Sequence, residues 1–263
     1  MGRALAMNRL NAGDIVIGTL RNPDDADFFD RLLPGRSIAV QLDVTDDFAV
    51  SSKIPAAIAQ VGGLDVLVNN AGHSLIGAVE ETTIEEAHSI MNANFFGALR
   101  MVKAVLPQFR SQGSGLIMNL ASVASTVGMP WTAMYSASKG ALASWSDSLG
   151  LELAGFGIRV ICLEPGGFRT NFTGRSLRAS ANSMAPYSEV VEGIKQRYAE
   201  AGSCLPNDPD KGADVIAQIS ELTKPPGRMA LGADGYAQIT GALRSRLAEY
   251  EVYCEMFSET GAH

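Results

Sequence analysis

The chain has 263 residues, and 21 Lys and Arg against 28 Asp and Glu give it a net charge of −7. Its hydrophobic share of 46% excludes a disordered chain, and its 27 Gly, 11 Pro and 3 Cys exclude collagen-like and disulfide-rich proteins. An acidic balance without a basic run argues against nucleic acid and anionic membrane surfaces as partners.

Short apolar runs alternate with helical segments through the first two thirds of the chain. Helices are predicted over residues 3–11, 25–33, 45–61 (capped by Thr45), 84–112 and 132–154, and strands over 15–20, 37–42, 64–68, 115–120 and 158–163. This alternation is typical of a parallel sheet that is covered on both faces. The sequence therefore predicts an α/β fold with a doubly wound sheet, which binds ligands at the carboxyl ends of its strands.

The pattern changes after Pro165. Residues 166–206 are rich in Gly, Ser, Asn and Arg, with an amphipathic stretch over 188–201. A long insertion at the carboxyl end of a strand is more often a lid over a site than a separate domain. The rest, 207–263, is predicted to form a helix over 209–223, a strand over 228–231 and a helix over 234–257. We therefore expect one domain over 1–263.

Tyr135 and Lys139 are four residues apart in a predicted helix, so both side chains lie on one face. On its own such a pair is usually a solvent-facing contact. In a site, the ammonium of Lys139 would lower the pKa of the Tyr135 phenol from about 10 toward working pH. Tyr135 would then exchange a proton with a hydroxyl or carbonyl oxygen.

Three further features lie near strand ends or inside a helix. Ser122 follows the strand over 115–120, and it either orients a substrate oxygen or caps a turn. Asn69-Asn70-Ala71-Gly72 follows the strand over 64–68, where small residues let the backbone approach a flat ligand or simply form a turn. Asn94 interrupts a predicted helix, either to bend it and bind a water or as a cap or exposed polar residue.

In this order and spacing, the motifs resemble the short-chain dehydrogenase/reductase family over nearly the whole chain. The motifs are Asn69-Asn70-Ala71-Gly72, Asn94, Ser122, Tyr135-Ser136-Ala137-Ser138-Lys139 and Pro165-Gly166. The resemblance implies a Rossmann-type fold and hydride transfer between a nicotinamide cofactor and an alcohol or carbonyl. It also implies that Tyr135 is the general acid/base, that Ser122 orients the substrate, that Lys139 assists Tyr135 and holds the nicotinamide ribose, and that Asn94 anchors a relay water.

The same resemblance implies a set of cofactor-binding residues. These are Gly2, Asp43 near the adenine amino group, Asn69, Ala71 and Gly72 along the cofactor, Tyr135, Lys139, and Pro165, Gly166 and Thr170 over the nicotinamide. Members that prefer NAD carry a carboxylate after the second family strand, but this chain has Gly18-Thr19-Leu20-Arg21 there. Arg21 would pair with a 2′-phosphate. We therefore predict that the cofactor is NADP, with NAD as the alternative. The alternative role of Arg21 is an ordinary surface charge. Asp43 is equally suited to cap the helix that follows it.

The chain departs from the family at its start. The family opens with a strand and a Thr-Gly-x-x-x-Gly-x-Gly turn, whereas this sequence begins Met1-Gly2-Arg3-Ala4, with Gly2 in place of the last glycine. The resemblance therefore implies that the first, central strand is missing, which leaves backbone groups unpaired at about 1–3 kcal/mol each. One hypothesis is a reading frame that begins upstream. The other is a catalytically impaired nucleotide-binding or regulatory protein.

The predicted lid suits an apolar alcohol or ketone substrate, although its apolar side chains would equally pack the lid against the body. They are Phe168, Phe172, Leu177, Met184, Tyr187 and Tyr198. A 3-oxoacyl-carrier-protein reductase is a rival, but its usual tail and a basic docking surface are lacking. The resemblance also implies a homodimer or homotetramer through 84–112 and 132–154, although the apolar residues of 132–154 equally suit burial against the sheet. Three scattered Cys and no long apolar run or secretory signal favour a cytoplasmic protein without a bound metal.

Overall fold

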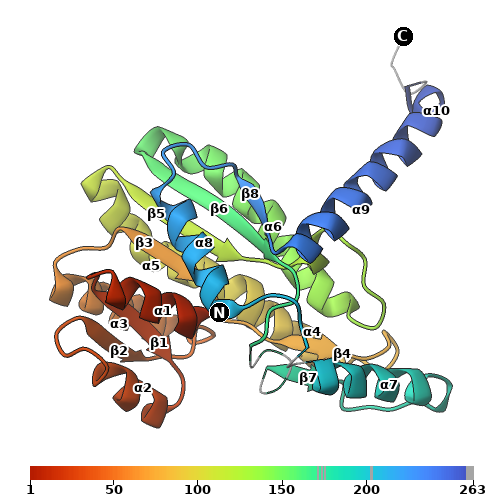
Figure 1. Cartoon of the computed structure of the whole chain (residues 1–263), viewed down its shortest axis with the longest axis horizontal. Coiled ribbons are helices and arrows are strands. Elements are labelled where there is room, and N and C mark those ends of the chain that lie inside the picture. Colours follow the sequence, from red (N-terminus) through yellow and green to blue (C-terminus); the bar gives the residue numbers. More distant parts are fainter. Residues whose placement is uncertain (171, 173, 175, 202–203, 259–263) are drawn as a thin grey trace.

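The structure is a computed structural model that describes residues 1–170, 172, 174, 176–201 and 204–258 (Figure 1). Its helices are α1 (Gly2–Asn11), α2 (Pro23–Asp30), α3 (Asp47–Val61), α4 (Ile84–Met91), α5 (Gly97–Gln112), α6 (Ala133–Leu153), α7 (Ala185–Ala201), α8 (Pro209–Glu221), α9 (Ala233–Val252) and α10 (Cys254–Ser258). Its strands are β1 (Val16–Leu20), β2 (Ser37–Gln41), β3 (Val66–Asn69), β4 (Ser74–Ile76), β5 (Gly115–Leu120), β6 (Ile158–Pro165), β7 (Leu177–Ala179) and β8 (Arg228–Leu231).

The main sheet is parallel and has the strand order β3-β5-β6-β8. A second parallel pair, β1-β2, lies beyond β3, and within the described residues no ladder bond joins β1 to β3. A third, short pair joins β4 to β7. The predicted α/β architecture with a parallel sheet is confirmed, and the sheet is interrupted between β1 and β3, where the resemblance implied a missing strand.

Helices cover both faces of the sheet. Successive side chains along each strand point to opposite faces, so each strand places apolar side chains on both. On one face, Ile117 of β5 and Val160 of β6 pack against α3, α5 and α6. On the other face, Met118 of β5 and Ile161 of β6 pack against α1 and α8. This alternation gives the doubly wound arrangement that the apolar runs predicted.

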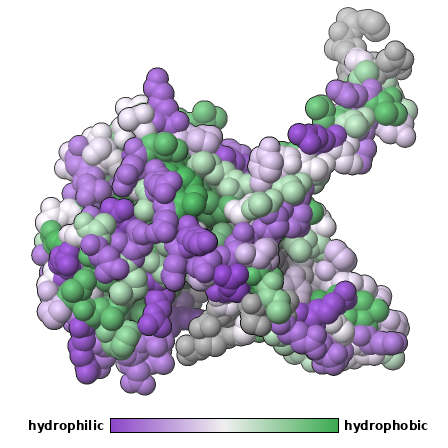
Figure 2. All heavy atoms as spheres, in the orientation of Figure 1, coloured by the Kyte–Doolittle hydropathy of each residue, from purple (hydrophilic) through white to green (hydrophobic). Residues whose placement is uncertain are grey.

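The C-terminal helix α9 starts against β8 and then runs away from the body (Figure 1). Exposed apolar side chains, among them Leu243, Leu247 and Val252, lie between polar ones on this projecting segment (Figure 2). The prediction of one helix over 234–257 is wrong, because the helix ends at Val252 and a turn at Tyr253 precedes α10. Among the described helices, none combines the length and the apolar character needed to cross a bilayer.

Two other boundaries differ from the sequence prediction. The helix expected from Thr45 begins at Asp47, because the Asp46 side chain accepts a hydrogen bond from the Ala49 N–H at 2.9 Å and serves as its N-cap. The single helix expected over 84–112 contains a π-helical turn, η1 (Asn92–Phe96), between α4 and α5. The short strands β4 and β7 were not predicted, since three residues give too little alternation to recognise.

Candidate active site

Ser122, Tyr135 and Lys139 meet at the carboxyl end of β5. Ser122 is the N-cap of a short 3-10 turn, η2 (Val123–Ser125), after that strand, so the predicted turn cap is present, and Tyr135 and Lys139 lie one turn apart in α6. A hydrogen bond links the Ser122 side chain to the Tyr135 phenol. The Lys139 ammonium is buried and donates to the Leu120 carbonyl oxygen at 2.7 Å. The arrangement can hold one substrate oxygen between two hydroxyl groups.

Burial governs the titration of this group. It raises the pKa of the Tyr135 phenol to about 12, against the lowering effect of the Ser122 hydrogen bond, and a contribution from Tyr198 adds to the rise. Burial also lowers the pKa of Lys139 to about 8. The sequence analysis predicted that Lys139 would bring the pKa of Tyr135 down, but the structure gives the opposite direction. The physical reason is desolvation of the phenol, while the ammonium is engaged by the Leu120 carbonyl.

Asn94 lies in the π-helical turn with only 1% of its surface exposed, so the alternative of an exposed polar residue is wrong. Its Oδ1 accepts from the His73 N–H at 2.9 Å, and its Nδ2 donates to the His73 carbonyl oxygen and to Ser138 Oγ, each at 2.9 Å. Ser138 Oγ in turn donates to the Tyr135 carbonyl oxygen at 2.8 Å. Asn94 therefore ties the segment after β3 to the turn of α6 that carries Tyr135, and its Oδ1 accepts one hydrogen bond from the described residues.

Two glycines allow close approach around this group. A Cβ on Gly72 would lie 2.7 Å from Asn94 Oδ1 and 3.6 Å from Lys139 Nζ. A Cβ on Gly2 would lie 2.7 Å from Asn70 Nδ2, so the N-terminus of α1 comes against the end of β3. Among the described residues, no side chain caps that helix. Ala71, next to Gly72, is exposed, and the first N–H groups of α1 beside Asn70 are of the kind that fits a pyrophosphate.

Asn69 is buried within the sheet layer. Its Nδ2 donates to Asn119 Oδ1 at 2.8 Å, and Asn119 Nδ2 donates to Ser146 Oγ at 2.8 Å. These bonds link β3, β5 and α6, so the side-chain amide of Asn69 holds the ends of β3 and β5 together.

Two arginines bring positive charge to Asp43 and His73. Burial opposes ionisation of Asp43, but two hydrogen bonds from Thr45 and the charges of Arg21 and Arg178 outweigh it, so the pKa of Asp43 is lowered. The pKa of His73 is lowered by burial first, then by Arg178, Arg21 and Lys139, against a hydrogen bond with the Ser74 backbone. Asp43 accepts from the Thr45 N–H and hydroxyl at 2.9 and 2.8 Å and is not the N-cap of α3.

The segment from Pro165 to Thr170 continues β6 past the sheet. Gly166 N–H donates to the Leu231 carbonyl oxygen at 2.9 Å, and Gly167 N–H donates to Asp234 Oδ2 at 2.8 Å. Asn207 Nδ2 donates to Asp234 Oδ1 at 2.6 Å and so braces the same carboxylate. Thr170 Oγ1 accepts from the Phe172 N–H at 3.3 Å, and its contact with nicotinamide stays a prediction.

Several residues around the site were missed by the sequence analysis. These are Asn119, Ser138, Arg178, Asn207 and Asp234. Ser138 lies inside the Tyr-x-x-x-Lys motif and Asn119 at the end of a predicted strand, so their positions were a usable signal. Arg178 reaches the site only because β7 pairs with β4, opposite Leu75.

The apolar residues of the predicted lid divide between two roles. Phe168 packs into the body core, and Leu177, Tyr187 and Tyr198 pack in a cluster around Ile76 of β4 and Val191 and Ile194 of α7. Phe172 instead lies against Tyr135, with ring centroids 5.7 Å apart. Most of these residues therefore hold the segment to the body, while Phe172 faces the phenol.

Comparisons with known proteins agree on one family. The sequence model of the short chain dehydrogenase family matches residues 1–181. A 3-ketodihydrosphingosine reductase of Bacteroides thetaiotaomicron is 34% identical over 88% of this chain and 83% of its own length. The crystal structure of a short-chain dehydrogenase from Streptomyces avermitilis is 38% identical, with a TM-score of 0.90 over 99% of this chain and 95% of that chain.

A more distant structure is a gluconate 5-dehydrogenase from Burkholderia cenocepacia in complex with NADP and tartrate. It is 25% identical, with a TM-score of 0.71 over 91% of each chain. Since the family model covers more than half of the chain and a relative 34% identical is matched over 83% of its length, the chain belongs to the short-chain dehydrogenase family and is an oxidoreductase acting on CH–OH groups.

Proposed function

We propose that this chain interconverts an alcohol and a carbonyl on an apolar substrate with NADP, and that Tyr135 is its general acid/base. The observation that carries the proposal is the hydrogen bond between the Ser122 side chain and the Tyr135 phenol, beside the buried Lys139. Two hydroxyl groups so placed fit a single substrate oxygen, which is what proton transfer in either direction requires.

In carbonyl reduction, the Ser122 hydroxyl donates a hydrogen bond to the substrate oxygen and fixes it beside the phenol. Tyr135 then gives its proton to that oxygen as negative charge develops there. Its raised pKa of about 12 keeps the phenol protonated at neutral pH, which suits this step. In alcohol oxidation the same oxygen returns the proton, and Asn94 and Ser138 keep the Tyr135 backbone in place.

The bound dinucleotide would supply or accept the hydride. Its pyrophosphate suits the N-terminus of α1 at Gly2, and its nicotinamide half suits the stretch between Lys139 and Pro165-Gly166. Arg21 and Arg178 put two positive charges near Asp43, which favours the 2′-phosphate of NADP over the hydroxyl of NAD. The NADP-bound gluconate dehydrogenase of similar fold supports this choice.

An apolar substrate is supported by the residues around the phenol. Phe172 lies against Tyr135, Val123 is buried beside Ser122, and the rings of Trp131 and Tyr187 lie 5.9 Å apart at the start of α6 and α7. A relative described as a 3-ketodihydrosphingosine reductase is consistent with a ketone on a long apolar chain.

The test is NADPH oxidation by the chain with a panel of hydrophobic ketones and, for contrast, small polar ketones. We expect turnover with the apolar ketones and a loss of about 10²–10⁴-fold in Tyr135→Phe with NADPH binding kept. Tyr250→Phe, an exposed tyrosine on α9, is the matched control and should keep full turnover. NADPH binding without turnover by the unaltered chain would instead identify a nucleotide-binding or regulatory protein.

A further inference from the structure

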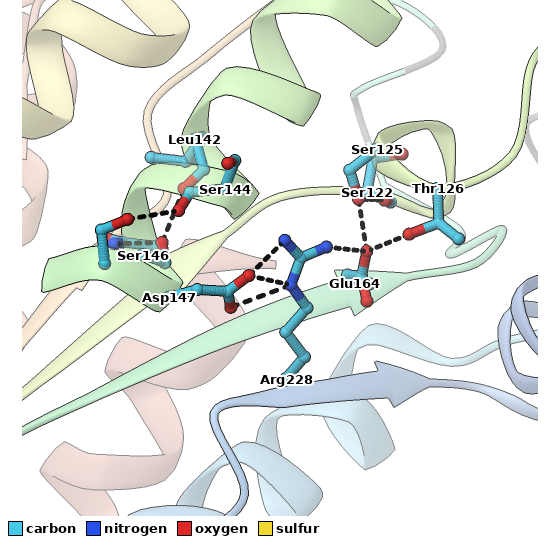
Figure 3. Close-up of polar contacts among 11 residues, drawn as sticks. Ser122, Ser125, Thr126, Leu142, Ser144, Ser146, Asp147, Glu164 and Arg228 are labelled. Carbon is cyan, nitrogen blue, oxygen red and sulfur yellow. Dashed lines mark hydrogen bonds and ion pairs between the residues drawn. The ribbon is translucent and has the colours of Figure 1, made fainter. Parts of the chain in front are cut away.

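Glu164 is a carboxylate buried in β6, with 3% of its surface exposed, directly before Pro165 and Gly166. Its Oε1 accepts hydrogen bonds from Ser125 Oγ at 2.5 Å and from Thr126 Oγ1 at 2.8 Å (Figure 3). The mechanism above does not use this group, although a buried charge is costly unless its surroundings hold it in place.

The charge of Glu164 is balanced from the side opposite the two hydroxyl groups. Arg228 of β8 brings Nη1 to 3.8 Å from Oε1, and the rest of its guanidinium binds Asp147 of α6 through Nη2 at 2.6 Å and Nε at 3.0 Å (Figure 3). Glu164 therefore joins η2, β6, β8 and α6 in one network. The two hydroxyl groups lie closer to it than the arginine does.

The hydroxyl contacts act on the turn that carries Ser122. Ser125 Oγ also lies 2.5 Å from the Ser122 carbonyl oxygen, and Ser122 Oγ accepts from the Ala124 N–H at 3.2 Å. The carboxylate thus holds the far side of the turn whose near side presents the Ser122 hydroxyl. Meanwhile the backbone of Glu164 runs directly into the Pro165-Gly166 segment, which is fixed to Leu231 and Asp234.

We propose that Glu164 is a positioning residue: it fixes the Ser122 turn relative to the Pro165-Gly166 segment and thereby holds the Ser122 hydroxyl against Tyr135. The inference rests on the proposed function, because positioning has meaning only for an enzyme that uses Ser122. Glu164 touches no reacting atom, so its effect passes through Ser122. A misplacement of about 1 Å at such a group costs up to about a hundredfold in rate.

The experiment is a double-mutant cycle of Glu164→Leu with Ser122→Ala, read in ketone reduction with NADPH. Glu164→Leu should lower kcat by about 30- to 100-fold and leave the KM for NADPH within about twofold, because the turn moves while the cofactor residues stay. In the Ser122→Ala background the same change should lower kcat by less than about twofold. Glu164→Gln keeps an oxygen acceptor for the two hydroxyl groups and should restore most of kcat.

A control variant and a replacement variant accompany Glu164→Leu. Glu152→Leu removes an exposed carboxylate from the same network helix, α6, and should change nothing. If Glu164→Leu does not fold, Thr126→Val removes the hydroxyl donor that binds Glu164 without touching Ser122, and it should reproduce part of the loss of kcat.

The contrary results are distinct. If the losses of kcat in Glu164→Leu and Ser122→Ala are fully additive in the double variant, Glu164 has only a structural role and the inference is overturned. The same holds if Glu164→Leu loses kcat and NADPH affinity equally. Unchanged kcat in the Thr126→Val variant would also overturn the inference. No turnover by the unaltered chain would refute the proposed function itself, and the role of Glu164 with it.

Discussion

Tyr135 carries a phenol whose pKa burial raises to about 12, and this value sets opposite pH dependences for the two directions. In the proposed mechanism, reduction uses the protonated phenol, so titration of the phenol itself should leave kcat unchanged from pH 6 to about 9. Oxidation uses the phenolate, which at pH 9 is about one molecule in a thousand, so its rate should rise about tenfold per pH unit without a plateau. Steady-state rates in both directions test this. A plateau below pH 8 would show a phenol that titrates far lower than burial implies.

Arg21 is the residue proposed to select the 2′-phosphate of NADP. Its charge acts on Asp43, two residues after β2, where the adenosine half of the cofactor is proposed to bind. Arg21→Ala should weaken NADPH binding by about ten- to a hundredfold and leave NADH binding unchanged, because only the phosphate pairs with a guanidinium. Fluorescence titration of both cofactors measures this, with the exposed Arg31→Ala as control. Equal losses for NADPH and NADH would contradict the assignment.

At the scale of elements, α7 is fastened to the body by Glu81. This buried carboxylate accepts from the Met184 N–H at 2.8 Å, directly before α7, and from the Ala78 N–H at 3.0 Å. These bonds, from Met184 first, lower the pKa of Glu81 below its ordinary value against the effect of burial. The carboxylate therefore stabilises the contact above its unfolded pKa, and the contribution is lost as pH falls through the lowered folded pKa.

Glu81→Ala should release the start of α7. We expect faster hydrogen exchange over residues 180–187 and a several-fold higher KM for the ketone, since α7 covers the proposed substrate side. Exchange measured by mass spectrometry tests the first and steady-state kinetics the second. Glu85→Ala, an exposed carboxylate four residues further along, is the matched control. Unchanged exchange over 180–187 in Glu81→Ala would show that the hydrogen bonds of Tyr187 to Glu80 and of Ala181 to Glu86, together with the packing on Ile76, suffice to hold the helix.

For the whole molecule, the interruption between β1 and β3 predicts uneven protection of the sheet. Val16 N–H donates to the Arg36 carbonyl oxygen at 2.7 Å, and alternate amides of a parallel strand point to opposite edges. Ile17 and Thr19 therefore direct their N–H groups to the edge that faces β3. These two should exchange much faster than Gly18 of the same strand, as measured by NMR. Equal protection of all three would reveal a hydrogen-bond partner for that edge.

The sequence by itself determined the layered fold, because its signals are local. Apolar runs separated by helical periodicity predicted the parallel sheet, and the strand over 115–120 matches β5 in both bounds. The four-residue spacing of Tyr135 and Lys139 put both on one helix face before any tertiary contact was considered. Asn94 was recognisable as a poor helix former, and a π-helical turn is found there.

Only the tertiary structure decided which distant groups meet. Asn94 binds Ser138 across 44 residues, and Glu81 binds Met184 across 103 residues, at separations where no periodicity reports a contact. The direction of the Tyr135 pKa shift also depended on the fold, because desolvation is set by the whole environment and outweighed the local pair that the spacing suggested. Local spacing thus selects the residues of the site, while packing between remote segments sets their partners and their charge.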